Sequence, residues 1–471
     1  MTLELSMQVM DDVSRRAAHL VGACGAGMKA LTEVLLDSHW SLSGSDLSPP
    51  NQAVQKLIDR GLVFHQGHRA ANVPDSAEHL VYSSAIPADN PERLEANRRH
   101  LPQFSYSQMV ARMMRDSIGV CIAGTHGKST TTAMTAQILY SANRLTAAVV
   151  GAELCEDGRS GRSGSGDLFV VESCEFQHSF LDFQPKFAAI LCVEHDHFDC
   201  YPNFESLETA FRNFAGRTAS DGVLLVNNDC GVSRRISTGA STRAKRISFG
   251  FDNTADWTAK NCEQTINGMR FFLSHRGMNV ADIDLRIRGM HNVCNALAAA
   301  ALCAEIGIQP EIIRESLASF RGIRRRCEFV GEWNGATFVD DYAHHPTAVT
   351  ATLKTLRNVV GKRRILCLFQ PHQILRTRSL MHEFAASFFE TDEAWIAPVF
   401  AARESAVDEP GLVSLELANC ISSNGVTARS FTSLDQIAIT LEDAVRPGDV
   451  IVTMGAGDID RIYHEFTRRI Q

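Results

Sequence analysis

The stretch 117–132, SIGVCIAGTHGKSTTT, constrains the fold of this chain more than any other part of its sequence. The apolar residues between 118 and 122 are typical of a buried parallel strand, and the glycines that follow predict a tight turn into a helix. Such a turn brings backbone N–H groups close to a polyphosphate. Lys128 is placed to reach the terminal phosphate oxygens, and the Ser129 hydroxyl is placed to bind Mg²⁺. We therefore predict a phosphate-binding loop made of Gly124, Thr125, His126, Gly127, Lys128, Ser129 and Thr130.

The match to the usual loop pattern G-x-x-x-x-G-K-[ST] is incomplete. The pattern would place its first glycine at position 122, where this chain has Ile122. The alternative is a glycine turn of purely structural purpose, but Lys128 directly after Gly127 is hard to explain by packing.

Length and composition limit the class of protein. A chain of 471 residues predicts two to four domains, and 45% hydrophobic with 21% charged residues is typical of a soluble α/β protein. No apolar run approaches the roughly 18 residues of a membrane span, and the N-terminus lacks the pattern of a secretory signal, so we expect a cytoplasmic protein without a membrane span. The net charge of −8 argues against nucleic acid as a partner.

The thirteen cysteines occur singly, without a C-x-x-C pair, and most lie in apolar segments. This pattern indicates buried thiols in a reducing compartment, with no disulfide framework and no zinc site of paired cysteines.

The N-terminal part begins like a dinucleotide-binding unit. An apolar run at 17–21 is followed by GACGAG at 22–27, and Asp46 comes about twenty residues later, after a second short strand. The spacing is G-x-x-G-x-G, which indicates NAD binding only weakly. A glycine turn of purely structural purpose is the alternative. A further strand is predicted at His79–Tyr82, with Ser83–Pro87 at its end, where ligands bind in open α/β sheets.

Acidic strand ends follow the phosphate loop. The Gly/Ser/Arg-rich segment Gly158–Gly166 is predicted to be a mobile surface loop that marks no domain boundary. Strands at Leu168–Val171 and Phe187–Val193 end in ESCE and EHDHFD. Carboxylates beside a phosphate loop suit Mg²⁺, and a bound cation would relieve the crowding of ionisable groups. Solvated surface acids are the alternative.

The last third of the chain is predicted to be another α/β unit. Strands expected at Ile365–Phe369 and Val450–Met454 alternate with helical segments. An alanine-rich helix is predicted to begin near Met290, with His291 and Asn292 either at a base edge or only capping the helix. For the arginine run 324–326, the alternative to a functional role is a charged face exposed to solvent.

The motifs GTHGKSTTTAM, VESCE, EHDHFD, GMHNVCNALAA, RRRCE, DDYAHHPT, FQPH with RTR, and TMGAGD occur in this order. Together they resemble the Mur ligases of peptidoglycan synthesis over nearly the whole chain, and GACGAGM, GSD, SSAIP and DDYAHHP are most like the alanine-adding branch. The resemblance implies an α/β chain of three domains. These are a Rossmann-like UDP-sugar domain at 1–114, a P-loop ATPase domain with a mostly parallel sheet at 115–324, and a Rossmann-like amino-acid domain at 325–471.

The resemblance also implies residue roles. ATP would be bound by the phosphate loop, with Lys128 as its clamp, and by His291, Asn292, Asn295, Arg326 and Asp340. Mg²⁺ would be bound by Ser129, Glu172 and His197. The substrates would be contacted by Gly25, Asp46 and Ser84 on the UDP side, and by Glu175, Tyr342, His344, His372 and Arg376 on the amino-acid side. The catalytic residues would be Lys128, His344 and Arg376.

The implied reaction is ATP-dependent addition of L-alanine to UDP-N-acetylmuramate through an acyl phosphate, by a monomer or weak homodimer. This chain departs from the family pattern at Cys174 and Gln177, which replace acids, and at Gln373, which replaces an arginine. The absence of lysine between Lys186 and Lys245 fits the alanine-adding branch. The alternatives are another Mur-type ligase, in peptide recycling or with glycine or L-serine, a nucleotide-dependent oxidoreductase, and a nucleotide-gated binding protein.

Overall fold

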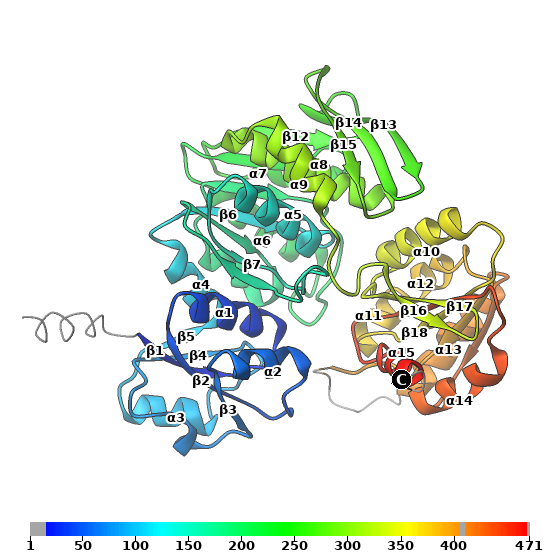
Figure 1. Cartoon of the computed structure of the whole chain (residues 1–471), viewed down its shortest axis with the longest axis horizontal. Helices are drawn as coiled ribbons and strands as arrows, with labels where there is room; N and C mark the ends of the chain where they lie inside the picture. The colour runs from blue at the N-terminus through cyan, green and yellow to red at the C-terminus, as the bar shows by residue number, and fades with distance from the viewer. Residues whose placement is uncertain (1–15, 403, 405–409, 469–471) are drawn as a thin grey trace, which may run out of the picture.

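The computed structural model describes residues 16–402, 404 and 410–468, which form three β-sheets with helices packed on them (Figure 1). Residues 1–15 and 469–471, the outer ends of the first and third predicted domains, lie outside the described residues. Nearly all of the N-terminal segment from which we predicted the absence of a secretory signal also lies outside the described residues. Among the helices described, none is both long and apolar enough to cross a membrane.

The first sheet has five parallel strands in the order β3-β2-β1-β4-β5, as expected of a Rossmann-like domain. Its strands are β1 (Ala17–Val21), β2 (Ser41–Asp46), β3 (Val63–Gln66), β4 (His79–Tyr82) and β5 (Gln103–Ser105). Its helices are α1 (Ala26–Asp37), α2 (Gln52–Asp59), the 3₁₀ turn η1 (Ala70–Asn72), α3 (Pro91–Arg98) and α4 (Tyr106–Met114). The predicted strands at 17–21 and 79–82 are confirmed.

The central sheet has ten strands in the order β15-β14-β13-β12-β11-β10-β6-β9-β7-β8, parallel in the middle and antiparallel at both ends. The strands are β6 (Ile118–Ala123), β7 (Leu145–Val149), β8 (Gly161–Ser163), β9 (Leu168–Glu172), β10 (Phe187–Ile190), β11 (Val223–Asn227), β12 (Lys245–Gly250), β13 (Trp257–Thr265), β14 (Gly268–His275) and β15 (Met278–Leu285). The helices are α5 (Lys128–Ser141), the 3₁₀ segment η2 (Phe176–Asp182), α6 (Phe204–Gly216), α7 (Gly231–Gly239), α8 (Met290–Ile306) and α9 (Pro310–Ser319).

Two predictions for the central part are wrong in detail. The strand expected at Phe187–Val193 ends at Ile190, because the chain then turns to the phosphate loop, where the Cys192 carbonyl accepts the N–H of Thr125. The segment Gly158–Gly166 is not a surface loop throughout. Residues 161–163 form the edge strand β8, and Ser160 and Gly161 are buried against α1 of the first domain.

The third sheet has the order β16-β17-β21-β18-β19-β20 and is parallel except for the β16–β17 pair. Its strands are β16 (Glu328–Trp333), β17 (Ala336–Asp341), β18 (Ile365–Phe369), β19 (Glu393–Ile396), β20 (Thr427–Ser430) and β21 (Val450–Met454). Its helices are α10 (Pro346–Val360), α11 (Ile374–Ser379), α12 (Met381–Ser387), α13 (Pro410–Ser423), α14 (Leu434–Ala444) and α15 (Arg461–Arg468). The strands predicted at 365–369 and 450–454 are confirmed.

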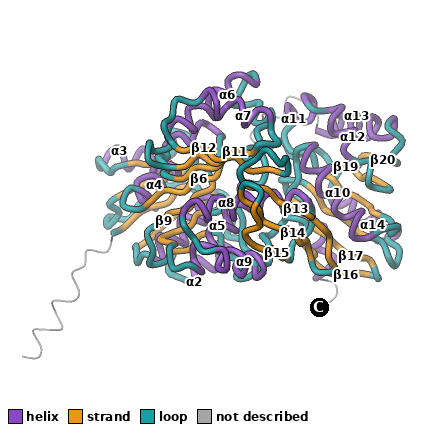
Figure 2. The backbone as a smooth tube through the Cα atoms, turned by 90° about the horizontal axis from the view of Figure 1, so that it is seen from above, coloured by secondary structure: helices purple, strands orange, loops and turns teal. Residues whose placement is uncertain are grey.

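Two of the domains share a hydrophobic core, and the third has cores of its own. One apolar cluster joins the first domain to the central one, since Leu31 of α1 and Met109 of α4 belong to the same cluster as Phe169 and Phe211. The third sheet has clusters of its own on its two faces. Figures 1 and 2 both show the third group of elements set to one side of the other two. We infer that the first and central domains are joined by apolar packing that the third domain does not share.

Candidate active site

The phosphate loop joins β6 to α5, and two glycines shape it. Gly124 and Gly127 have φ angles of 140° and 81°, which residues with a Cβ rarely adopt. A Cβ on Gly127 would also overlap the side-chain oxygen of Asn295 on α8. The Thr125 N–H fixes the loop to the neighbouring strand end by donating to Cys192 at 2.6 Å. The loop therefore offers the glycine turn and the helix N-terminus that a polyphosphate site uses.

Lys128 begins α5, and its ammonium group is almost completely enclosed. Nζ donates to a carboxylate oxygen of Glu175 at 2.9 Å and to the carbonyl oxygen of Gly124 at 2.5 Å. Burial lowers the pKa of this ammonium, but the nearby Glu175 and Glu172 carboxylates outweigh burial, so the pKa is raised overall. Lys128 is a fixed positive charge at the loop.

Ser129 and Glu172, two of the three expected metal ligands, meet beside the loop. The Ser129 hydroxyl donates to one carboxylate oxygen of Glu172 at 3.0 Å, and the other oxygen accepts the Gly151 N–H at 2.7 Å. His197, the third expected ligand, lies beside Glu175 instead, with Nε2 3.8 Å from its carboxylate. The His197 Nδ1 atom is buried and has no hydrogen-bond partner within the described part of the chain.

The start of α8 lies beside the phosphate loop and carries the three residues expected at the adenine and ribose. The Asn295 amide donates to Asn292 at 3.2 Å, and the Asn292 amide donates to the carbonyl of Arg288 at 2.7 Å. Burial lowers the pKa of His291 to about 4, with a smaller effect from Arg326. The helix is capped by Gly289, so neither His291 nor Asn292 is its N-cap. His291 is therefore a neutral, partly buried imidazole at pH 7.

Arg325, which the sequence did not single out, pairs with Asp340. Its Nε donates to the Asp340 carboxylate at 3.0 Å, whereas Arg326 lies over the ring of Tyr342 at 5.2 Å. Burial raises the pKa of Asp340 to about 6, although Arg325 and a Thr453 hydrogen bond oppose this. The Asp340 carboxylate is thus paired with Arg325, and the expected contact of Arg326 and Asp340 with ATP stays a prediction. A run of three arginines contains no signal for which of them meets the acid.

Glu194 connects the phosphate loop to the third domain. Its carboxylate accepts a hydrogen bond from the Thr347 hydroxyl at 2.6 Å and contacts His126 Nε2 at 3.0 Å, with His345 Nδ1 at 3.5 Å. Burial raises the pKa of Glu194, but these partners outweigh burial and lower the pKa to about 2. The sequence indicated an acidic strand end here but not its partners, of which His126 lies 68 residues earlier in the chain and Thr347 lies 153 residues later.

Arg376 is also engaged across the two domains. Its Nε donates to Asp196 at 2.7 Å, and its Nη1 lies 3.1 Å from His372 Nδ1. Both charged groups are buried, with side-chain exposures of 3% and 6%. Gln373, at the start of α11, contacts Asp199 of the central domain at 3.4 Å. The carboxylate of Asp196, which the sequence did not assign, holds the guanidinium that was expected to bind substrate.

Three of the residues expected on the amino-acid side form a ring cluster near this pair. The rings of Tyr342 and His344 are 5.3 Å apart, and those of His344 and His372 are 5.9 Å apart. Burial lowers the pKa of His344 well below its usual value, so its imidazole is neutral at pH 7. Tyr342, His344, His372 and Arg376 therefore lie near one another, and their contact with the amino acid, which the family resemblance implies, stays a prediction.

The residues expected on the UDP side lie at the carboxyl ends of parallel strands β1, β2 and β4. Gly25 caps α1, Asp46 accepts the Cys24 N–H at 2.9 Å, and Ser84 is exposed. Sequence reasoning missed Glu92 on α3, which is fully buried and accepts from Ser45 at 2.5 Å. Burial raises the pKa of Glu92, but hydrogen bonds from His19, Ser45 and Asn72 lower it to about 2.

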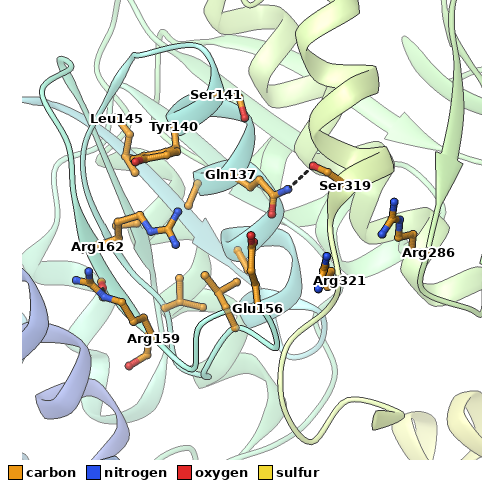
Figure 3. A pocket seen from close by; sticks show the side chains of 17 residues that line it. Gln137, Tyr140, Ser141, Leu145, Glu156, Arg159, Arg162, Arg286, Ser319 and Arg321 are labelled. Carbon is orange, nitrogen blue, oxygen red and sulfur yellow. Dashed lines mark hydrogen bonds between the residues drawn. The ribbon is translucent and has the colours of Figure 1, made fainter. Parts of the chain in front are cut away.

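A cavity of about 330 Å³ lies away from the phosphate loop, between α5, β7, the β8 segment and the end of α9 (Figure 3). Apolar side chains such as Leu145 and Val150 line it, and the Gln137 amide donates to Ser319 at its edge. None of the residues expected to bind ATP, metal or substrate lines it.

The chain matches three family models in order. Residues 17–117 match the Mur ligase family catalytic domain, 122–303 the Mur ligase middle domain, and 325–457 the Mur ligase glutamate ligase domain. This chain belongs to the Mur ligase family, whose enzymes are ATP-dependent ligases.

Its relatives within the family include UDP-N-acetylmuramate–L-alanine ligases. The one from Anaeromyxobacter dehalogenans strain 2CP-1 is 38% identical over 95% of this chain and 96% of that protein. The one from Clostridium acetobutylicum is 34% identical over 98% and 99%. Among solved structures, the UDP-N-acetylmuramate–alanine ligase of Thermotoga maritima has a TM-score of 0.80 at 23% identity, covering 97% of this chain and 99% of that one. A murein peptide ligase from Psychrobacter arcticus has a TM-score of 0.73 at 22% identity, covering 96% and 98%. These two structures support the three-domain fold.

Proposed function

We propose that this chain joins L-alanine to UDP-N-acetylmuramate at the expense of ATP, in the synthesis of a peptidoglycan precursor. The relatives that match it over nearly their whole length carry this activity in their names. One observation carries the proposal. The phosphate loop with Lys128 and the third-domain cluster around Arg376 lie at the same side of the central sheet.

The chemistry requires an activated carboxylate, because a free carboxylate does not acylate an amine. Transfer of the γ-phosphoryl group from ATP to the muramate carboxylate forms an acyl phosphate and releases ADP. The amino group of L-alanine then attacks the acyl carbon, the C–O bond to phosphate breaks, and phosphate leaves with the amide formed. Lys128 stabilises the charge that develops on the transferred phosphoryl oxygens.

The alanine side of the reaction is assigned to the ring cluster. A neutral His344 can accept the proton that the amine loses, or hold the amine in position, and Arg376 is the cation for the amino-acid carboxylate. Gly25, Asp46 and Ser84 are assigned to the UDP moiety, and His291, Asn292, Asn295, Arg326 and Asp340 to ATP.

Mg²⁺ is part of the proposal, and the residues present suit it. Ser129 and Glu172 supply hard oxygen atoms next to the loop, and His197 supplies a buried nitrogen that lacks a partner among the described residues. The ion would neutralise charge on the phosphates. We further propose that the protein is cytoplasmic and is a monomer or weak homodimer. Its domains would be divided near residues 114 and 324.

One assay tests the activity. ADP release is measured with ATP, Mg²⁺ and UDP-N-acetylmuramate, with and without L-alanine, and with glycine or L-serine in its place. We expect sustained release that depends on both the UDP-sugar and L-alanine. Release that requires a muramyl peptide or another amino acid would assign a different Mur-type reaction. Release that depends on no acceptor, or a nicotinamide absorbance change with a hydroxy acid, would reject ligation.

A further inference from the structure

Two histidines and one glutamate from separate parts of the chain meet between the central and third domains. His126 lies in the phosphate loop, Glu194 follows β10, and His345 is the N-cap residue of α10. One ligand atom from each side chain lies within 4.8 Å of the other two. The rings of the two histidines are 4.8 Å apart and inclined by 52°, so they do not stack face to face.

The two distances from the Glu194 carboxylate to the histidine nitrogens are close to those of a tetrahedral metal site. Glu194 Oε2 is 3.0 Å from His126 Nε2 and 3.5 Å from His345 Nδ1. Ligand atoms at the corners of a tetrahedron with Zn–N and Zn–O bonds of about 2.0–2.1 Å are about 3.3 Å apart. Two imidazoles and one carboxylate are ligands that Zn²⁺ binds well, whereas Mg²⁺ takes mainly oxygen ligands and suits a site with two imidazole nitrogens less well.

We propose that His126, Glu194 and His345 bind one Zn²⁺ ion that links the central domain to the third domain. The ion would hold the third domain against the phosphate loop. Each domain alone supplies an incomplete ligand set, two residues from the central domain and one from the third, so binding depends on their docking.

The electrostatics of the cluster favour a cation. Glu194 is ionised, and the Asp196 carboxylate lies near His345, where it is paired with the buried Arg376, the cation that opposes a metal ion there. Burial, with a contribution from His126, lowers the pKa of His345 to about 4, so this imidazole is neutral at pH 7. The Thr347 N–H donates to His345 Nδ1 at 3.4 Å, a long hydrogen bond that a metal on Nδ1 would replace.

A second group of potential ligands provides the contrast. Cys174, Glu175 and His197 also lie within 4.8 Å of one another, but all three belong to the central domain. The Lys128 ammonium is 2.9 Å from Glu175 and repels a cation there. Within the described residues, His126, Glu194 and His345 are therefore the group that both spans two domains and lacks a lysine in direct contact.

The test is a Zn²⁺ titration of the full-length chain, stripped with a chelator and held in millimolar Mg²⁺, followed by competition with a chromophoric chelator. We expect one Zn²⁺ per chain, and visible absorption bands of four-coordinate Co²⁺ when Co²⁺ replaces it. His345→Asn should weaken binding at least tenfold and remove the Co²⁺ bands. Asparagine is a good N-cap residue, so this variant should keep α10 capped.

His197→Ala is the matched control and should leave the Zn²⁺ affinity unchanged. Binding that His345→Asn does not alter, or that His197→Ala abolishes, would overturn the proposal, as would the absence of stoichiometric binding. Circular dichroism checks the fold of each variant. Should His345→Asn fail to fold, Glu194→Gln carries the same expectation. These binding measurements do not depend on ligase activity, so failure of the proposed reaction would leave them interpretable.

Discussion

Lys128 shows how one residue can be fixed by its neighbours before any substrate binds. Its ammonium is paired with the buried Glu175, so a neutral replacement would remove the charge from the phosphate loop and leave a buried carboxylate without its cation. We expect Lys128→Met to lower ADP release by more than about 100-fold, since such contacts contribute roughly 3 kcal/mol or more in the transition state. Binding of the UDP-sugar should be nearly unchanged, because its proposed residues lie in the first domain.

Lys245→Met is the control for Lys128. This lysine is in the same domain and also pairs with a glutamate, Glu305, but it is 60% exposed. Its replacement should leave ADP release within about twofold, as for most surface ion pairs. Turnover above a tenth of the wild-type value in Lys128→Met would contradict the role of this residue.

His291 gives the chain a pH dependence that can be assigned to one residue. Burial lowers its folded-state pKa to about 4 from the usual 6.5, so the folded protein disfavours the imidazolium. The unfolded chain therefore binds the proton first, and stability is lost as the pH falls from 6.5 towards 4. His291→Asn removes this loss. We expect the variant to gain stability relative to wild type over that range, by up to about 3 kcal/mol.

The measurement for His291 is the difference in thermal unfolding midpoint between variant and wild type from pH 7.5 to 4.5. His275→Asn, on β14, supplies the comparison for loss of a histidine elsewhere in the central domain. A difference for His291→Asn that stays constant across this range would show that the imidazole is accessible to protons in the folded state.

The elements of this fold follow from local sequence more closely than the contacts between them. The strands at Ala17–Val21, His79–Tyr82 and Ile365–Phe369 have the predicted bounds, because short apolar runs between turn residues are typical of buried parallel strands. The prediction that Gly158–Gly166 is a surface loop was wrong because the order of this segment depends on a residue outside it. Its glycines and serines favour a loop, but Glu33 on α1 accepts hydrogen bonds from Ser160 and Gly161, and orders the segment.

The same limit applies to the site. The glycine loop and the strand-end acids were predictable because each motif is local, whereas the residues of the ring cluster were expected only from the family resemblance. The partners Asp196 and Arg325 were not predictable, because each meets a residue that only the folded chain brings close.

Gly161 tests whether the β8 segment holds the first two domains together. A Cβ at this position would overlap the backbone carbonyl of Ala30 on α1, so Gly161→Ala must push β8 away from that helix. We expect faster amide hydrogen exchange at 158–166 and a lower thermal midpoint, because the two N–H groups bound to Glu33 lose their acceptor.

Gly216→Ala is the matched control, because a Cβ there makes only an ordinary contact of 3.5 Å with Ser241. It should leave exchange at 158–166 unchanged. Unaltered exchange in Gly161→Ala would mean that β8 does not depend on α1.

At the scale of the whole molecule, the two domain junctions differ in kind. Apolar side chains of α1 and α4 share a core with the central sheet, which favours one fixed arrangement. Glu194, Asp196 and Asp199 of the central domain hydrogen-bond to side chains of the third domain, so this junction contains polar contacts between charged and polar groups. Polar junctions of this kind permit relative motion, so we infer that the third domain opens and closes on the other two.

Arg376 lies at that junction, and two roles have to be separated for it. It is the residue proposed to hold the amino-acid carboxylate, and it is also the buried partner of Asp196. Arg376→Met leaves the Asp196 charge buried and unpaired, which costs about 3–5 kcal/mol in such pairs. We expect this variant to show an increased radius of gyration in solution scattering and a KM for L-alanine raised by about 10- to 150-fold, the value of a charge-assisted hydrogen bond.

The double variant Asp196→Asn with Arg376→Met separates the two roles. Removing both charges relieves the unpaired carboxylate, so the radius of gyration should return towards the wild-type value. The KM for L-alanine should stay high, because the cation for the carboxylate is still missing, and the KM for ATP should change little in either variant. Arg378→Met, an exposed arginine on the same helix, controls for loss of positive charge. If the double variant recovers its KM for L-alanine, Arg376 acts only by docking the third domain, and if Arg378→Met raises that KM instead, Arg378 holds the substrate carboxylate.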